Sequence, residues 1–210
     1  KELGVSKRDL FSLSDHVDKK SRIEDIYDYC NEEGILCYQV VRMFPKDFRM
    51  RKPDGRGGWI WSGPSEDEVV PYNLPSVQEA LKKDETIYVV EGEKDCNTLI
   101  SIGLVATSNH GGARKWYDTH SKRLKDADVV IIPDQDISGK DHAQKVARSL
   151  LGTAKTVRVV DLPGLPPKGK DISDWFAHGH SKEELLSLVK STANFTDASK
   201  EKFAEKKENK

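Results

Sequence analysis

The sequence predicts an α/β protein with a mainly parallel sheet of about four strands flanked by helices, preceded by a small basic antiparallel β unit. A strand is expected at 86–90, where residues 87–90 form a continuous apolar run with strong β preference, and the helical spacing of Cys96, Leu99 and Ile100 follows it. Residues 129–132 repeat this strand-then-helix pattern. An apolar strand followed by a helix is typical of a parallel sheet that is covered on both faces. Ligands of such sheets bind at the carboxyl ends of the strands, so we expect the functional residues there.

The other elements of the parallel sheet domain are predicted by similar signals. We expect strands at 104–107 and 157–160, because both are short apolar runs bounded by turn residues. Helices are expected at 76–83, from about 138 to 151, and after Ser181, since a possible capping residue precedes an amphipathic stripe in each case.

The chain ahead of this domain is expected to begin with a helix. Ser21 and Glu24 form a capping-box pattern, and Gly34 is a natural helix stop. The apolar residues between them have helical spacing, so a short helix is predicted here. These residues are Ile23, Ile26, Tyr27 and Cys30.

From Leu36 to Tyr72 the apolar period changes towards two, which predicts a small antiparallel sheet with a turn at 53–55. The segment from Arg42 to Arg56 has six basic and two acidic residues. Basic residues interleaved with aromatic ones suit a groove that follows phosphates and stacks bases. The alternative is a solvated hairpin whose tryptophans lie in a minor core. The candidate nucleic-acid-binding residues are Arg42, Arg49, Arg51, Lys52, Arg56, Trp59 and Trp61.

Carboxylates follow two of the predicted parallel strands. Glu91 ends the first strand, and Asp134 and Asp136 follow the second. In an extended segment residues i and i+2 point the same way, so the two aspartates are expected to converge, with Glu91 on a neighbouring strand. Such a cluster is repulsive without a cation, and oxygen ligands favour Mg²⁺ or Mn²⁺.

These two acidic motifs, Glu91-Gly92-x-x-Asp95 and Asp134-x-Asp136-x-x-Gly139, together resemble the Toprim domain. That fold is shared by bacterial-type primases, type IA and II topoisomerases and several nucleases. The resemblance implies that Glu91, Asp134 and Asp136 are catalytic and hold the metal. Glu91 would either complete the metal shell or act as general base, and these two roles remain open.

Two further segments support the primase branch of this resemblance. Arg42-Met43-Phe44-Pro45 and Pro71-Tyr72-Asn73-Leu74-Pro75 are similar to the basic subdomain that precedes Toprim in bacterial and phage primases, where it guides the template strand. The segment beginning at Lys170-Asp171 is similar to one that lies beside the metal centre in that family. Asp171 is therefore a candidate outer or second metal ligand, and capping of the following helix is the alternative.

The turn after the 104–107 strand contains Gly111 and Gly112 and is expected to offer backbone N–H groups to a phosphate. Its alternative role is a tight connection only, and His110 is expected to be a turn residue. The candidate nucleotide-phosphate ligands are Lys94, Gly111, Gly112, Arg114, Lys115 and Lys140.

The chain has 210 residues, of which 36% are hydrophobic and 33% charged, with a net charge of −1. This composition predicts a cytoplasmic globular protein without a membrane partner, and nucleic-acid binding through a local patch rather than through overall charge. Cys30, Cys37 and Cys96 lack CxxC spacing, so we expect free thiols in a reducing compartment and no zinc site.

The expected organisation is a linker (1–20), a small basic α+β subdomain (21–83), a Toprim catalytic domain (84–190) and a charged tail (191–210). The predicted function is metal-dependent nucleotidyl transfer, namely RNA primer synthesis on single-stranded DNA from nucleoside triphosphates, with a possible helicase partner. Alternatives are a Toprim nuclease, a catalytically silent nucleic-acid-binding module and an unrelated acidic-pocket α/β protein. A topoisomerase is the least favoured, because no strand-cleaving tyrosine domain is visible.

Overall fold

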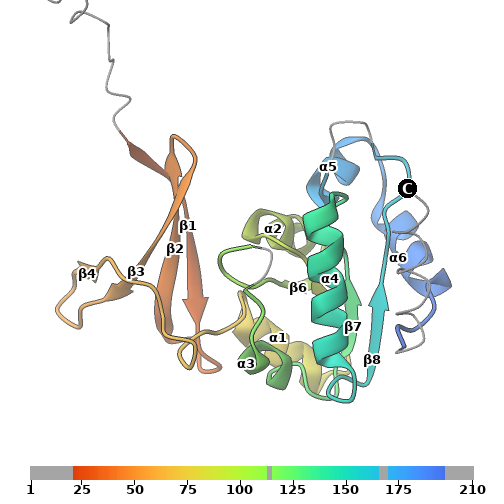
Figure 1. The fold of residues 1–210 in the computed structure, drawn as a ribbon, viewed down its shortest axis with the longest axis horizontal. Coiled ribbons are helices and arrows are strands. Elements are labelled where there is room, and N and C mark those ends of the chain that lie inside the picture. The colour runs from red at the N-terminus through yellow and green to blue at the C-terminus, as the bar shows by residue number, and fades with distance from the viewer. Residues whose placement is uncertain (1–20, 113–114, 166–169, 197–210) are drawn as a thin grey trace, which may run out of the picture.

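The computed structural model describes residues 21–112, 115–165 and 170–196 and contains two four-stranded sheets (Figure 1). The first sheet is antiparallel with strands in chain order, and the second is parallel with the order β6-β5-β7-β8. The predicted α/β fold, with a parallel sheet preceded by an antiparallel unit, is confirmed. The strands are β1 (Arg22–Cys30), β2 (Leu36–Phe44), β3 (Asp47–Pro53), β4 (Trp59–Ile60), β5 (Ile87–Val89), β6 (Val105–Thr107), β7 (Asp128–Ile131) and β8 (Thr156–Val159).

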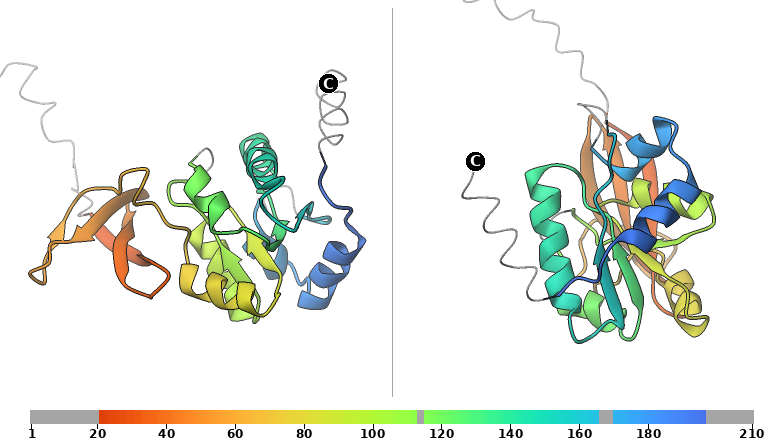
Figure 2. Two further views of the ribbon diagram at one scale, coloured as in Figure 1. Left: turned by 90° about the horizontal axis from the view of Figure 1, so that it is seen from below. Right: turned by 90° about the vertical axis from the view of Figure 1, so that its right-hand side faces the viewer.

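Helices cover both faces of the parallel sheet, with α4 on one side and α6 on the other (Figure 2, right). Helices α2 and α5 pack on the same side as α6, and α1 lies beside the edge strand β6. Among the described residues, no helix is both long and apolar enough to cross a membrane. The helices are α1 (Leu74–Lys82), α2 (Glu93–Ser101), α3 (Asp118–Lys122), α4 (Ile137–Leu150), α5 (Ile172–Ala177) and α6 (Lys182–Ser191).

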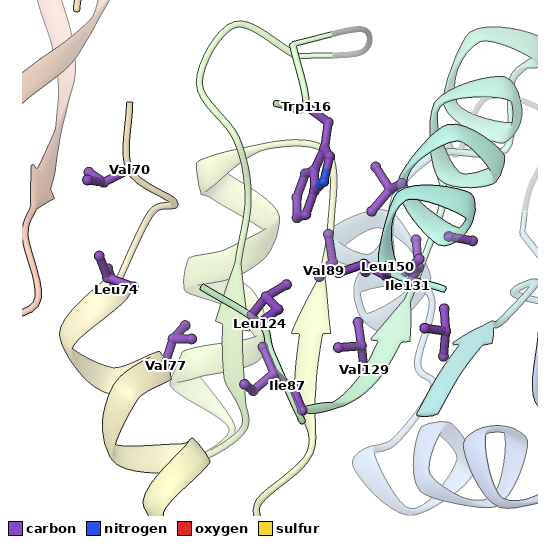
Figure 3. Packing of buried hydrophobic residues seen from close by; sticks show 14 of the residues in the cluster. Val70, Leu74, Val77, Ile87, Val89, Trp116, Leu124, Val129, Ile131 and Leu150 are labelled. Carbon is purple, nitrogen blue, oxygen red and sulfur yellow. The ribbon is translucent and has the colours of Figure 1, made fainter. Parts of the chain in front are cut away.

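The central strand β5 has apolar side chains on both faces. Ile87 and Val89 belong to a core that includes α1 and α4, whereas Tyr88 and Val90 pack with α2, α5 and α6. Figure 3 shows Ile87, Val89 and Leu150 in the first of these layers. Burial of alternate residues on opposite faces explains why the strand is a continuous apolar run in the sequence.

The prediction of a helix after Ser21 is wrong, because this segment forms strand β1 and pairs antiparallel with β2. Tyr27 and Tyr29 are buried on one face, whereas Ile23 and Ile26 are each 44% exposed. Burial alternates with period two from Ile26 to Tyr29, and a register shift between Ile23 and Asp25 places Ile23 on the same face as Ile26. Pairing with β2 overrode the helical spacing, and Tyr and Ile are residues that strands accommodate well.

Smaller differences concern helix boundaries and the end of the described chain. Helix α1 begins after Asn73, two residues before the expected start, and Asp136 rather than Ser138 caps α4. Phe195 lies in the predicted charged tail, yet its side chain is 8% exposed and packs into the core. The three cysteines are free thiols, with only Cys96 fully buried.

Candidate active site

The acidic motifs lie at the carboxyl ends of two adjacent strands. Strands β5 and β7 are parallel neighbours, with Val89 opposite Ile131, and Glu91 and Asp134 follow them. Both carboxylates line a cleft of about 430 Å³ between the two sheets. The predicted juxtaposition of Glu91 and Asp134 is therefore present in the structure.

The two walls of the cleft differ in charge and in aromatic content. The wall from the parallel sheet domain carries the carboxylates of Glu91, Glu93, Asp95 and Asp134. The opposite wall comes from the antiparallel sheet and contains Tyr27, Arg42, Lys46 and Phe48. An acidic wall facing a basic and aromatic one suits a ligand that combines negative phosphates, a cation and a flat ring.

Tyr27, Lys46 and Phe48 were not among the residues predicted for this site. Arg42 pairs directly with Phe48 across β2 and β3, so the two side chains share a face of the sheet. The sequence carries a signal for the hairpin, but which of its faces meets the cleft depends on how the two sheets pack.

Asp134 is held in a tight position by the first turn of α4. A Cβ atom added to Gly139 would lie 2.6 Å from both the Cβ atom and the carbonyl oxygen of Asp134. Only glycine permits this approach, which explains the glycine of the second acidic motif. Burial, followed by repulsion from Glu91, Asp95 and other carboxylates, raises the pKa of Asp134 to about 7.

Asp136 has a different role from Asp134. Its Oδ1 atom accepts a hydrogen bond from the backbone N–H of Gly139 at 2.8 Å and caps α4. Its Oδ2 atom lies 3.4 Å from the Lys170 ammonium group. The hydrogen bond from Gly139 and the nearby Lys170 lower the pKa of Asp136. Asp136 is thus engaged at the N-terminus of α4. It acts on Asp134 through its charge, instead of converging with it on one ligand as expected.

Asp171 connects the acidic wall to α5. It caps this helix by accepting a hydrogen bond from the backbone N–H of Asp174 at 2.7 Å, and it lies 3.5 Å from the Lys94 ammonium group. Nearby, Ser173 donates a short hydrogen bond to Asp95. Burial and the charge of Asp171 raise the pKa of Asp95 to about 6. The capping role predicted as the alternative for Asp171 is present, and the metal role remains a prediction.

The predicted phosphate ligands are only partly gathered at the cleft. Lys94, Gly111 and Gly112 line it, and both glycines have positive φ angles, 75° and 68°. Lys115 packs beside Gly111, while Lys140 is exposed on α4. Arg114 lies outside the described residues.

The predicted nucleic-acid-binding residues are divided between two faces of the antiparallel sheet. Arg42 lines the cleft, whereas Arg49 and Arg51 pair with Val41 and Gln39, whose side chains point to the other face. Arg42 lies 3.1 Å from Glu24 and Arg49 lies 3.0 Å from Asp47.

The outer face carries an arginine stacked on exposed aromatic rings. The Arg51 guanidinium lies 4.1 Å from the ring centroid of Trp59 and 5.5 Å from that of Trp61. The tryptophans are 38% and 55% exposed, so the alternative in which they form a minor core is wrong. Lys52 pairs with Glu68, and Arg56 is exposed in the turn.

The acidic wall matches the ligand chemistry of a hard divalent cation. Its donors are carboxylate oxygens, and burial, followed by repulsion from neighbouring carboxylates, raises the pKa values of Asp134 and Asp95, so a bound cation would relieve an existing electrostatic cost. Among residues 21–112, 115–165 and 170–196, no three His, Cys, Asp or Glu side chains are already arranged as a metal-binding group.

Comparison with known proteins identified relatives of one kind, although no family model matches the chain. The DNA primase DnaG of Aeropyrum pernix is 29% identical over 123 residues, which are 59% of this chain and 27% of the relative. The DNA primase DnaG of Staphylothermus marinus is 23% identical over 175 residues, which are 83% of this chain and 36% of the relative. The chain thus spans only about a third of the length of the curated relatives it matches.

Solved structures of primases have a similar fold. The Aquifex aeolicus primase (zinc-binding and RNA polymerase domains) has a TM-score of 0.60 and 21% identity, covering 81% of this chain and 40% of that one. A DnaG primase catalytic domain bound to single-stranded DNA has a TM-score of 0.55 and 19% identity, covering 80% and 53%. The resemblance to the primase type is confirmed: the chain is similar to DnaG primases in sequence and has the fold of the primase catalytic core.

Proposed function

We propose that this chain is the catalytic module of a Toprim-type primase, which joins ribonucleotides into a primer on single-stranded DNA. The observation that carries the proposal is the cleft between the acidic strand ends and the basic, aromatic wall of the antiparallel sheet. The sequence likeness to DnaG primases and the shared fold support it.

Glu91 and Asp134 are the proposed principal ligands of Mg²⁺ or Mn²⁺, with Asp136 and Asp171 at the margin of the site. When bound, the cation supplies charge neutralisation and alignment of the phosphate oxygens. Glu91 has the alternative role of general base towards the attacking hydroxyl group, because its carboxylate lines the same cleft.

The remaining groups are proposed to bind and orient nucleotide and template. Lys94, Arg42 and Lys46 bring cationic side chains to the cleft, and the backbone of Gly111 and Gly112 lies beside them. Lys115 and Lys140 lie outside this inner group, so we assign them to the outer phosphates.

Single-stranded DNA is the proposed partner of the antiparallel sheet, through Arg49, Arg51, Trp59 and Trp61 of its outer face. The structure of a DnaG catalytic domain with single-stranded DNA supports this choice of partner. A helicase, fused or separate, is a further proposed partner in replication.

A primer-synthesis assay tests the function directly. The full chain is incubated with single-stranded DNA, ribonucleoside triphosphates and Mg²⁺ or Mn²⁺, beside a parallel assay for strand cleavage. We expect primers with the wild type and none with Asp134→Asn. Asp67→Asn makes the same charge change at an exposed position outside the cleft lining and should retain activity. Cleavage without synthesis would replace the proposal by the nuclease alternative.

A further inference from the structure

Two tyrosines of the antiparallel sheet make buried hydrogen bonds to the parallel sheet domain. The Tyr29 hydroxyl group donates to Glu93 Oε1 at 2.7 Å, and the Tyr38 hydroxyl group lies 3.2 Å from His110 Nδ1. Tyr29 and Tyr38 are 0% and 1% exposed. A phenyl ring alone would satisfy an apolar interface, so the two hydroxyl groups add directional constraints that Phe would lack.

The two bonds start from one stacked pair. Tyr29 and Tyr38 are direct cross-strand partners, with ring centroids 4.7 Å apart and an interplanar angle of 16°. The Tyr38 hydroxyl group also donates to the carbonyl oxygen of Val70 at 3.1 Å. Because a hydroxyl group has a single proton, His110 must donate from Nδ1 to the Tyr38 oxygen. His110 further packs edge-on against both rings.

The partners of this pair are adjacent in sequence to the two loops of the cleft. Glu93 is two residues after Glu91, and His110 immediately precedes Gly111. Glu91, Glu93, Gly111 and Gly112 all line the cleft. A shift of either loop away from the antiparallel sheet would break a buried hydrogen bond and leave a polar group unsatisfied.

We propose that Tyr29 and Tyr38 are positioning residues that hold the Glu91 loop and the Gly111–Gly112 loop at a set distance from the basic wall. This assignment rests on the proposed function, because it ascribes a role to the spacing across the same cleft. The tyrosine pair transmits the position of the antiparallel sheet to both loops and itself touches no reacting group.

Hydrogen exchange of the full chain, measured by mass spectrometry, tests the positioning role without requiring activity. Tyr29→Phe should raise exchange in peptides covering 91–99, and Tyr38→Phe in peptides covering 105–112, by roughly tenfold because a buried hydrogen bond is lost. Ser149→Ala is the control, since the Ser149 hydroxyl group donates to the Val146 carbonyl oxygen at 2.8 Å and accepts from Ser121 at 3.1 Å, in α4 and α3 and outside both peptides and the cleft lining. It should leave both regions close to the wild type.

A second pair of variants guards against a general loss of packing. Glu93→Gln keeps an acceptor for Tyr29 and should retain wild-type exchange, whereas Glu93→Ala should reproduce the effect of Tyr29→Phe.

In the primer assay, Tyr29→Phe and Tyr38→Phe should lower kcat several-fold and change KM for nucleotide by less than twofold. Exchange in both tyrosine variants equal to that of Ser149→Ala would overturn the positioning role. A wild type that makes no primers would count against the proposed function alone, because the exchange comparison would still decide the role of the tyrosines.

Discussion

At the residue scale, Asp134 and Asp136 carry the same side chain in opposite electrostatic settings. Burial and neighbouring carboxylates raise the pKa of Asp134 to about 7, whereas the Gly139 N–H and Lys170 lower that of Asp136. A strongly perturbed carboxyl group in a cleft is typical of a functional site. We infer that the Asp134 carboxylate carries most of the electrostatic cost of the cluster, through burial first and repulsion second, and that Asp136 serves mainly to anchor α4.

Asp134→Asn should stabilise the protein in EDTA at pH 8 by about 1–2 kcal/mol, a value reduced for solvent screening because Asp134 is only partly buried. The folded-state pKa is raised above the unfolded value near 4, so ionisation costs stability as the pH rises from about 4 to 7. Asn resembles the protonated acid, and its advantage should therefore vanish near pH 4.

Urea unfolding at several pH values measures this difference, with Asp67→Asn as control. Mg²⁺ should reduce the advantage at pH 8, because it stabilises the wild type. Equal unfolding free energies of wild type and variant at pH 8 in EDTA would show that neither burial nor repulsion penalises the Asp134 carboxylate.

At the scale of single elements, β1 contains side chains with opposite environments at consecutive positions. Tyr27 is 6% exposed and Ile26 is 44% exposed. A helix with the predicted stripe would bury both residues on one side. In the strand, the antiparallel pairing with β2 places them on opposite faces.

Tyr27→Ala should therefore lower the free energy of unfolding by about 3 kcal/mol, and Ile26→Ala by about 1 kcal/mol, according to the apolar area that each removes from the core. Equilibrium urea unfolding of the two variants measures both losses of unfolding free energy and so checks their ratio. Equal losses would contradict the assignment of β1 as a half-buried strand.

The outer face of β3 and β4 allows a binding prediction at the same scale. If Arg49, Arg51 and Arg56 contact template phosphates, each Arg→Ala change should reduce the salt slope of single-strand affinity by about 0.7. Trp61→Ala should cost about 1–3 kcal/mol of binding through lost base stacking. It should leave folding nearly unchanged, because Trp61 is 55% exposed.

Fluorescence-anisotropy titrations over several salt concentrations, with a melting curve for each variant, separate binding from stability. Lys122→Ala removes an exposed charge on α3, outside the outer face and the cleft lining, and should keep wild-type affinity and slope. If the variant with Arg49, Arg51 and Arg56 all changed to Ala keeps the wild-type affinity and salt slope, the outer face does not bind single strands and is a solvated surface.

At the scale of the whole molecule, one hydrophobic core joins the two sheets. Tyr29 and Tyr38 of the antiparallel sheet belong to the same cluster as Ile87 and Val129 of the parallel sheet. An exposed ion pair between Arg123 and Glu32, at 2.9 Å, also connects the two parts. The apolar contacts dominate, because exposed ion pairs stabilise by about 1 kcal/mol at most.

A shared core predicts a single cooperative unfolding transition. Far-UV circular dichroism and tryptophan fluorescence should give the same urea midpoint, and Tyr38→Ala should shift both midpoints together. Trp59 and Trp61 report on the hairpin, and Trp116 and Trp175 on the parallel sheet domain. Two separate transitions would show that the sheets are stable independently.

Local patterns in the sequence were sufficient to predict the parallel sheet domain. The apolar runs before Glu91 and Asp134 predict buried strands, and glycines and capping residues mark the helices that follow. These signals are local, because a helix forms its hydrogen bonds within its own segment and a strand buried on both faces is apolar throughout. The acidic residues could be assigned to strand ends on the same grounds.

Only the tertiary structure decided the identity of β1, the division of the hairpin into two faces and the composition of the cleft. A strand takes its hydrogen bonds from a remote partner, so helical spacing at Ile23 and Ile26 could not exclude pairing with β2. The roles of Tyr27, Lys46 and Phe48 likewise depend on packing between two sheets that are distant in sequence. Such contacts have no local pattern, because either face of the hairpin could have met the acidic strand ends.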